Sequence, residues 1–231
     1  MDGPGAPVIR IAAAIPAYDA APSVGDVVRR TRCLLAEVLV VDDGSTDATA
    51  ERARSAGAEV VSFPGNQGKG SALRLAFERL FSAGADAVVT LDADGQHLPE
   101  EIPRLLEKAG QADLVIGGRE HLFSQMGAVR RASNRASSAV ISAVAGVRLG
   151  DVQSGFRLYG RRLFETVGFP ENGFDAESAV VVRAVRRGLR IESVPVELGF
   201  ADGRTTSHYR PLVDSLRIAR AVARARWETL R

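Results

Sequence analysis

Cysteine is nearly absent from this sequence, and long apolar runs are missing altogether. The single cysteine, Cys33, cannot form a disulfide within the chain, which suits a reducing compartment. No run of about 18 or more apolar residues is present, so no segment is expected to span a bilayer. The first residues, MDGPGAP, lack both a basic start and an apolar stretch, so we expect no secretory leader. These absences predict a cytoplasmic protein.

Charge is unevenly distributed along the chain. Residues 1–115 contain 11 Lys and Arg and 17 Asp and Glu, a balance of −6, whereas residues 116–231 contain 19 and 11, a balance of +8. The basic second half reflects either an arginine-rich composition alone or a surface built to meet phosphate or an anionic membrane. The chain lacks the aromatic residues on which bases stack, so we expect no nucleic-acid partner.

Short apolar runs alternate with segments of helical periodicity in the first half. Strands are predicted at 8–14, 37–41, 59–63, 87–91 and 113–116, and helices at 23–35, from about 47 to 56, at 71–83 and at 99–108. Ser23 is expected to be the N-cap of the first helix, and Pro16 to break the first strand. Such alternation predicts an α/β fold with a mostly parallel central sheet flanked by helices.

The second half continues the pattern less regularly. Helices are predicted at 130–145, 178–187 and 211–231, with a late strand at 191–198. No linker or repeat divides the chain, so we expect one domain over 1–231. The helix at 211–231 is basic and amphipathic, and it either packs on the domain or lies in a membrane interface, which would make the protein peripheral on the cytoplasmic face of a membrane.

Polar side chains follow several of the predicted strands directly. Asp42 and Asp43 end one strand, Asp92 and Asp94 follow another, and Arg119 follows a third. In open parallel sheets, ligands bind beyond the carboxyl ends of the strands. These side chains are therefore expected to converge on one crevice, where Asp42 and Asp43 could bind a nucleoside's base or ribose hydroxyls.

The stretch Asp92-Ala93-Asp94-Gly95-Gln96 offers oxygen ligands to a hard cation. Mg²⁺ and Mn²⁺ bind through one or two carboxylates together with substrate phosphates. The turn at Gly95 would let Asp92, Asp94 and Gln96 address one point. The alternative is a solvated turn that uses Asp and Gly for local hydrogen bonds. His97 and His208 lack metal-ligand spacing and are assigned no role in coordination.

The loop at 65–70 could approach a ligand closely, with Lys69 supplying positive charge. It is not a phosphate-binding P-loop, because it lacks both the required glycine spacing and a Ser or Thr after the lysine. No Gly-x-Gly-x-x-Gly follows the first strand, so a dinucleotide cofactor is not indicated. A surface lysine beside a helix start is the alternative for Lys69.

Six stretches resemble successive motifs of family 2 glycosyltransferases. They are IPAYDAAPSVGDVV, VLVVDDGSTDAT, NQGKGSALRLAF, LDADGQHLPEEI, LVIGGR and DVQSGFRLY, between about Ile9 and Leu198. Their order resembles most closely the polyprenyl-phosphate sugar synthases of the dolichyl-phosphate mannose and dolichyl-phosphate glucose synthase type. The resemblance implies a GT-A fold, a nucleoside diphosphate sugar donor of the GDP-mannose or UDP-glucose type, a Mg²⁺ or Mn²⁺ ion, and inversion at the anomeric carbon.

The resemblance also implies which residues bind the donor. Pro16, Tyr18 and Asp42 would lie against the nucleoside, and Lys69 near it or its phosphates. Asp92, Asp94 and Gln96 would hold the metal and, through it, the diphosphate. One departure is that Asp19-Ala20 stands where the family often has Asn-Glu after the tyrosine. The missing glutamate would remove a donor contact.

On the acceptor side, the resemblance implies a polyprenyl phosphate. Arg119 and Arg130 match positions that grip the acceptor phosphate, with Asn134 where a serine is often found, and Arg204 matches a loop residue that can close on the diphosphate. The alternative for both Arg119 and Arg130 is a surface salt bridge.

The acceptor decides whether the reaction needs a base. A lipid phosphate is already anionic and needs none, whereas a sugar or glycan hydroxyl needs a carboxylate to accept its proton. Asp175 and Glu177 are the candidates for that base, with helix capping as the alternative for Asp175. A nucleotide-sugar-binding domain without turnover also stays open.

Overall fold

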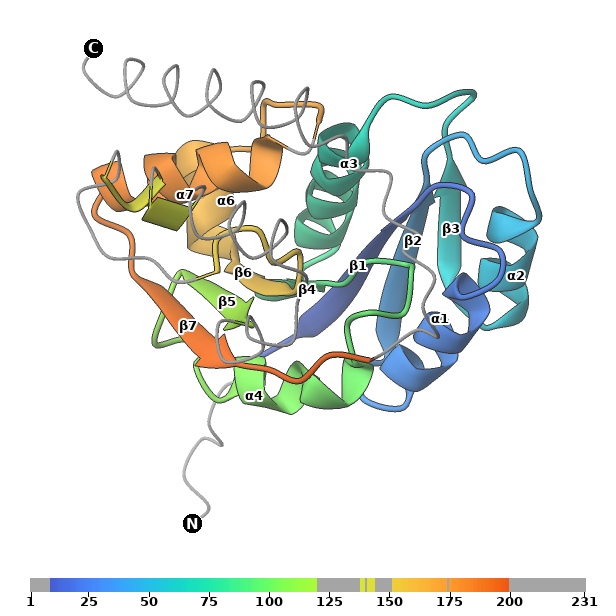
Figure 1. Ribbon diagram of the computed structural model, residues 1–231, viewed down its shortest axis with the longest axis horizontal. Coiled ribbons are helices and arrows are strands. Elements are labelled where there is room, and N and C mark those ends of the chain that lie inside the picture. Colours follow the sequence, from blue (N-terminus) through green and yellow to red (C-terminus); the bar gives the residue numbers. More distant parts are fainter. Residues whose placement is uncertain (1–8, 120–137, 140, 144–150, 174, 200–231) are drawn as a thin grey trace.

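The computed structural model describes residues 9–119, 138–139, 141–143, 151–173 and 175–199 (Figure 1). Its strands are β1 (Ile11–Ala17), β2 (Glu37–Asp42), β3 (Glu59–Ser62), β4 (Ala87–Thr90), β5 (Leu114–Gly118), β6 (Arg157–Gly160) and β7 (Ile191–Pro195). Its helices are α1 (Val24–Arg32), α2 (Thr49–Ser55), α3 (Lys69–Ser82), α4 (Ile102–Leu106), α6 (Arg161–Val167) and α7 (Ala176–Arg186), with a 3-10 turn, η1, at Pro99–Glu101.

The seven strands form one sheet in the order β3-β2-β1-β4-β6-β5-β7. Neighbouring strands run parallel except at β6, which is antiparallel to both β4 and β5. All the strands other than β6 therefore point the same way, and the mostly parallel sheet that the sequence predicts is confirmed. No helix among the described residues is long and apolar enough to cross a membrane.

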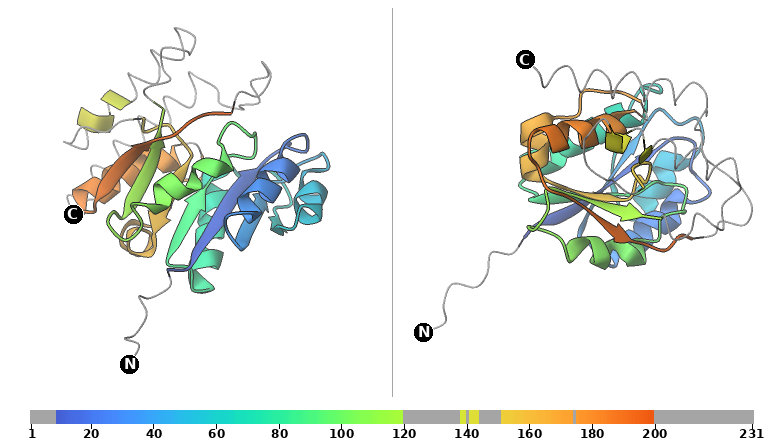
Figure 2. Two further views of the ribbon diagram at one scale, coloured as in Figure 1. Left: turned by 90° about the horizontal axis from the view of Figure 1, so that it is seen from below. Right: turned by 60° about the vertical axis from the view of Figure 1, so that its left-hand side comes forward.

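Helices cover both faces of the sheet because successive strand residues point to opposite sides. On one face, Ala12 and Ala14 of β1 pack with α3, α6 and α7. On the other face, Ala13 and Ile15 pack with α1, α2 and α4. The right-hand view of Figure 2 shows β5 and β7 between α7 on one side and α4 on the other. Because helices cover both faces of the sheet, polar side chains that are to meet a ligand lie at the ends of the strands.

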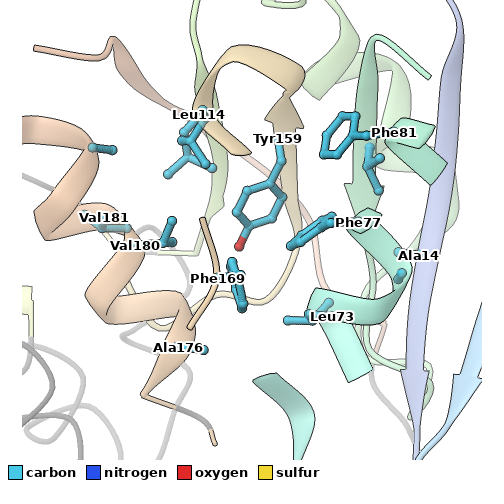
Figure 3. Packing of buried hydrophobic residues seen from close by; sticks show 14 of the residues in the cluster. Ala14, Leu73, Phe77, Phe81, Leu114, Tyr159, Phe169, Ala176, Val180 and Val181 are labelled. Carbon is cyan, nitrogen blue, oxygen red and sulfur yellow. The ribbon is translucent and has the colours of Figure 1, made fainter. Parts of the chain in front are cut away.

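Aromatic rings fill the centre of the cluster between the sheet and the helices α3, α6 and α7. The ring of Tyr159 lies 4.8 Å from that of Phe77, and the ring of Phe169 lies 5.1 Å from Phe77 on another side (Figure 3). Val180 and Val181 of α7 approach the same cluster from the opposite side. Burying such large rings together packs α3 and α7 against β6.

Two predictions about strands were wrong. The first strand does not break at Pro16 but runs on to Ala17. Ala14 O accepts a hydrogen bond from Leu91 N and Ala17 O accepts one from Asp43 N, so the alternation turns the Pro16 nitrogen toward the β4 side, where the pairing has already ended. Proline is tolerated there because no ladder bond is lost. The other error is the omission of β6, a four-residue strand too short to show alternation.

The remaining strands and helices predicted within the described residues are confirmed, with shifted ends. The helix predicted at 130–145 lies mostly outside the described residues, and that at 211–231 entirely so. The single domain over 1–231 stays a prediction. Ser23 is the N-cap residue of α1, but its hydroxyl makes no capping bond and donates instead to the carbonyl of Ala93, at 2.6 Å.

Candidate functional site

The carboxyl ends of the parallel strands and the start of β6 lie at one edge of the sheet. Thr90 of β4 and Ile116 of β5 both pair with Arg157, the first residue of β6. The loop before β6, residues 151–156, is therefore beside the ends of β4 and β5. Side chains that follow these strands share one edge, as the sequence predicts.

The loops after β1 and β2 are tied together by polar side chains. Asp19 has a positive φ of 46°, a conformation that aspartate adopts more readily than most residues. Its Oδ1 accepts a hydrogen bond from Thr46 N at 2.8 Å, and Thr49 Oγ1 accepts one from Ala20 N at 2.7 Å. Asp19-Ala20, the departure from the family pattern, thus has a structural use in joining the two loops.

Asp43 holds the glycine-rich loop that precedes α3. Its two carboxylate oxygens accept hydrogen bonds from Gln67 N at 2.7 Å and Gly68 N at 2.9 Å. Burial raises the pKa of Asp43, and the two backbone bonds oppose that rise. Asp42 is also buried, and its Oδ1 accepts a bond from Ser45 N. Asp43 therefore positions the loop, and donor binding by Asp42 and Asp43 stays a prediction.

Lys69, the first residue of α3, links two carboxylates from different elements. Its Nζ lies 2.7 Å from Asp92 Oδ1 and 2.8 Å from Glu177 Oε2. Burial would lower the pKa of Lys69, but the two carboxylates raise it above its usual range. Burial would likewise raise the pKa of Asp92, but Lys69, followed by His97 and Arg119, lowers it well below its usual range. Asp92 is therefore an anion with a fixed positive neighbour.

Gly155 packs directly on the Lys69–Asp92 pair. A Cβ at this position would lie 2.7 Å from Lys69 Nζ and 2.9 Å from Asp92 Oδ2, closer than real Cβ atoms approach. Its carbonyl accepts a hydrogen bond from Thr90 Oγ1 at 2.7 Å. The absence of a side chain therefore lets the backbone before β6 close over the ion pair.

The start of α3 leaves no room for a side chain at Gly70. An alanine Cβ there would lie 2.4 Å from Glu171 O and 2.8 Å from Asn172 C. Gly70→Ala is expected to lower the free energy of unfolding by about 1–3 kcal/mol, because backbone atoms must shift. Urea titration measures this.

The control is Gly25→Ala, at the second position of α1, as Gly70 is of α3. Its nearest neighbour would be the flexible end of Arg29, at 3.4 Å. That variant should be unchanged or more stable by up to about 1 kcal/mol. Equal effects in the two variants would contradict the close approach at Gly70.

His97 belongs to the site although the sequence assigned it no role. It is 2% exposed, and its ring stacks on Phe156 with the centroids 5.4 Å apart. Its Nδ1 accepts a hydrogen bond from Asp92 N at 3.1 Å, which orients the start of the acidic stretch. Burial lowers the pKa of His97 to about 4, so the ring is neutral at pH 7.

The buried neutral imidazole predicts a loss of stability in mild acid. An unfolded histidine titrates near pH 6.5 and the folded one near 4, so protonation favours the unfolded chain as pH falls between those values. Between pH 7.5 and 5.0, this group should remove about 2 kcal/mol of the free energy of unfolding. His97→Asn keeps an acceptor near the Nδ1 position but does not titrate, and should lose less over the same range. Equal losses in both proteins would refute the assignment.

Arg119 and Asp151 form a second buried ion pair at the same edge. Arg119 Nε lies 2.5 Å from Asp151 Oδ2, and the two residues are 6% and 1% exposed. The positive charge of Arg119 contributes to the low pKa values of Asp92 and His97. The surface salt bridge considered for Arg119 is therefore wrong, because the pair is buried beside the acidic stretch.

The acidic stretch fits a cation that is shared with a ligand. Asp94 and Gln96 are partly exposed, and Asp94 Oδ1 accepts a hydrogen bond from Gln96 N at 2.9 Å. Among the described residues, no group of three or more His, Cys, Asp or Glu could enclose a metal. Two carboxylates and an amide oxygen instead suit Mg²⁺ or Mn²⁺ completed by substrate phosphates. Metal binding by Asp92, Asp94 and Gln96 stays a prediction that this donor set supports.

Glu177 and Asp175 lie at the start of α7 in different surroundings. Glu177 is buried, with Oε2 on Lys69 and Oε1 without a hydrogen-bond partner among the described residues. Asp175 is the N-cap residue of α7, but its side chain makes no capping bond, so the capping alternative is wrong. A catalytic role for either residue stays a prediction.

The other expected site residues divide into two groups. Pro16 and Tyr18 are partly exposed at the end of β1, where contact with a nucleoside stays a prediction. Arg130, Asn134 and Arg204 lie outside the described residues.

Arg157 was not assigned a site role, and it organises the loop before β6. It is fully buried, and its guanidinium donates to Ser154 O, Val152 O and Glu177 O, each at 2.7 Å. The loop that carries Asp151 and Gly155 is thereby joined to the start of α7. Its place in the stretch DVQSGFRLY, one of the six that resemble family motifs, was the signal for it in the sequence.

Comparison with known sequences gives consistent results. The family model described as glycosyl transferase family 2 matches residues 13–168. An undecaprenyl-phosphate mannosyltransferase of Micrococcus luteus is 33% identical over 201 residues, which cover 81% of this chain and 83% of the relative. Glycosyltransferase AglJ of Haloferax volcanii is 34% identical over 78% of this chain, and an undecaprenyl-phosphate 4-deoxy-4-formamido-L-arabinose transferase of Klebsiella pneumoniae is 30% identical over 86%. The chain spans 60% and 63% of the length of these last two relatives.

Solved structures share the architecture. Glucosyl-3-phosphoglycerate synthase from Mycobacterium tuberculosis, in complex with Mn²⁺, uridine diphosphate and glucosyl-3-phosphoglycerate, superposes with a TM-score of 0.72 at 23% identity. The match covers 95% of this chain and 79% of that one. At this identity the likeness concerns the fold.

Proposed function

This chain belongs to glycosyl transferase family 2 and has the GT-A fold, and from that premise we propose that it transfers a sugar from a nucleoside diphosphate sugar to a polyprenyl phosphate. The undecaprenyl-phosphate relatives support the acceptor. The observation that carries the proposal is the pair of neighbouring charges at the sheet edge: the Asp92 carboxylate, suited to a donor-bound cation, and the buried Arg119 guanidinium, suited to a phosphate.

In the proposed reaction, an oxygen of the lipid phosphate attacks the anomeric carbon of the sugar. The bond from that carbon to the diphosphate oxygen breaks, and the configuration inverts. Arg119 would hold the attacking phosphate, which is anionic at neutral pH and needs no base. Asp92, Asp94 and Gln96 would hold Mg²⁺ or Mn²⁺, which when bound offsets charge developing on the leaving diphosphate.

The occupation of Glu177 supports an anionic acceptor over a hydroxyl. Lys69 pairs with Glu177 Oε2 at 2.8 Å and neutralises its charge, and Glu177 is 7% exposed, so this carboxylate is poorly placed to accept a proton from a hydroxyl. We propose further that the protein works at the cytoplasmic face of a membrane, because the acceptor is a lipid. GDP-mannose and UDP-glucose are the donor types proposed.

A donor panel tests the proposed function. UDP-glucose and GDP-mannose are each incubated with polyprenyl phosphate in detergent, with Mg²⁺, Mn²⁺ or EDTA, and both phases are analysed by mass spectrometry. A lipid-phase product heavier than polyprenyl phosphate by one hexose, absent with EDTA, is expected, and the anomeric coupling in its NMR spectrum should report inversion. If the sugar appeared only in water-soluble products, the proposed lipid-phosphate acceptor would be refuted. If no donor were consumed, the proposed enzymatic activity would be refuted.

A further inference from the structure

Asp151 is a buried carboxylate that forms an ion pair with one cation, Arg119, among the described residues. It is 1% exposed, and its Oδ2 accepts the Nε–H of Arg119 at 2.5 Å. Its other oxygen, Oδ1, accepts Gln153 N at 3.2 Å. Taking a carboxylate out of water is costly unless it is paired, so Arg119 and Asp151 depend on each other.

The pair uses the side of the guanidinium and not its end. Arginine has five N–H donors, and the contact with Asp151 is made by Nε. In the described part of the chain, neither terminal nitrogen of Arg119 has a hydrogen-bond partner. These two nitrogens form the planar fork with which arginine binds phosphate oxygens.

Holding the loop before β6 does not require Asp151. Arg157 already donates to Val152 O and Ser154 O, and Thr90 Oγ1 donates to Gly155 O. These bonds come from β6 and β4, independently of Arg119. The loop therefore has its own anchors, and the one ion pair of Asp151 among the described residues is with Arg119.

We propose that Asp151 is a positioning residue for the acceptor: it holds Arg119 by Nε so that both terminal nitrogens are presented to the acceptor phosphate. This rests on the proposed function, because the fork needs a phosphate-bearing acceptor. An arginine that is fixed before the acceptor arrives loses less side-chain entropy on binding. The carboxylate also fixes the plane of the guanidinium, which a bidentate contact requires.

Asp151→Asn tests the inference through separate Michaelis constants. The KM for polyprenyl phosphate should rise about tenfold, while kcat and the KM for the sugar donor change less than about twofold. In an Arg119→Met background, Asp151→Asn should add no further increase. If Asp151 had a purely structural role, Asp151→Asn would instead change the KM for polyprenyl phosphate and the KM for the sugar donor alike. Its effect would then add to that of Arg119→Met.

Asp113→Asn is the matched control. Asp113 precedes β5, at the strand end opposite Arg119, and its carboxylate also pairs with an arginine, Arg162, at 3.5 Å. Its acceptor KM should match that of the wild type. An unchanged acceptor KM in Asp151→Asn, or equal effects in an Arg119→Met background and the wild type, would overturn the inference.

A second variant covers misfolding of Asp151→Asn. Arg119→Lys keeps a cation for Asp151 but loses the fork, so it should raise the acceptor KM at least about tenfold with an unchanged melting temperature. An unchanged acceptor KM would overturn the inference. If the wild type uses no lipid phosphate, the proposed function itself fails; if it does and the variants match it, the positioning role alone fails.

Discussion

Replacing Asp94 with alanine is expected to reduce sugar transfer by about 10³-fold or more while the protein stays folded. The carboxylate is partly exposed beyond β4, so its removal costs little packing. It would, however, remove one of two charged ligands of the proposed cation, and the leaving diphosphate would lose its charge compensation. Transfer is measured by the mass of the lipid product, and folding by the melting temperature.

Binding provides a second readout for Asp94→Ala. The loss of bound Mn²⁺, followed by electron paramagnetic resonance with a nucleoside diphosphate present, should accompany the loss of transfer. Asp26→Ala is the control, because that carboxylate is 57% exposed on α1 and pairs with Arg29 and Arg30 of the same helix. Wild-type activity in Asp94→Ala would remove the metal assignment.

Replacing Arg157 with methionine should cause the largest loss of stability. Two loop carbonyls, of Val152 and Ser154, would lose their donor at once, and Glu177 O would lose its bond to the guanidinium and keep only its bond within α7. Each unsatisfied group costs about 1–3 kcal/mol, so we expect the free energy of unfolding to fall by about 4 kcal/mol. Methionine fills part of the space but donates no hydrogen bond.

Chemical denaturation of Arg157→Met and Arg162→Met gives the comparison. The side chain of Arg162 is 72% exposed, and its ion pair with Asp113 spans 3.5 Å, so its loss should cost under about 1 kcal/mol. A fall of less than about 1 kcal/mol in Arg157→Met would show that the guanidinium does not hold the loop before β6.

The regular part of the fold was predictable because its signals are local. Apolar runs such as those of β2 and β4 are buried strands, and their alternation with helical periodicity determines a parallel sheet. β6 was not predicted because its four residues, which end in glycine, are too few to show the alternation of apolar and polar residues that is typical of a strand. Its antiparallel direction depends on pairing with β4 and β5, which no local pattern encodes.

The position of the candidate site was predictable from the sequence, but its side-chain contacts were only partly predictable. Residues following parallel strands share an edge, so Asp92 and Arg119 were expected near each other. The bridging of Asp92 and Glu177 by Lys69 depends on how α3 and α7 pack over a hundred residues apart in the sequence. Likewise, the role of His97 follows from burial against Phe156, which a lone histidine in the sequence does not reveal.

The central claim is that Asp92, Asp94 and Gln96 hold a cation that binds the donor's diphosphate. A crystal grown with Mn²⁺ and UDP or GDP tests this claim most directly. An anomalous peak for Mn²⁺ is expected within about 2.5 Å of side-chain oxygens of Asp92, Asp94 and Gln96, with diphosphate oxygens completing the coordination. A diphosphate bound elsewhere, with the carboxylates of Asp92 and Asp94 facing bulk water and no manganese between them, would contradict the claim.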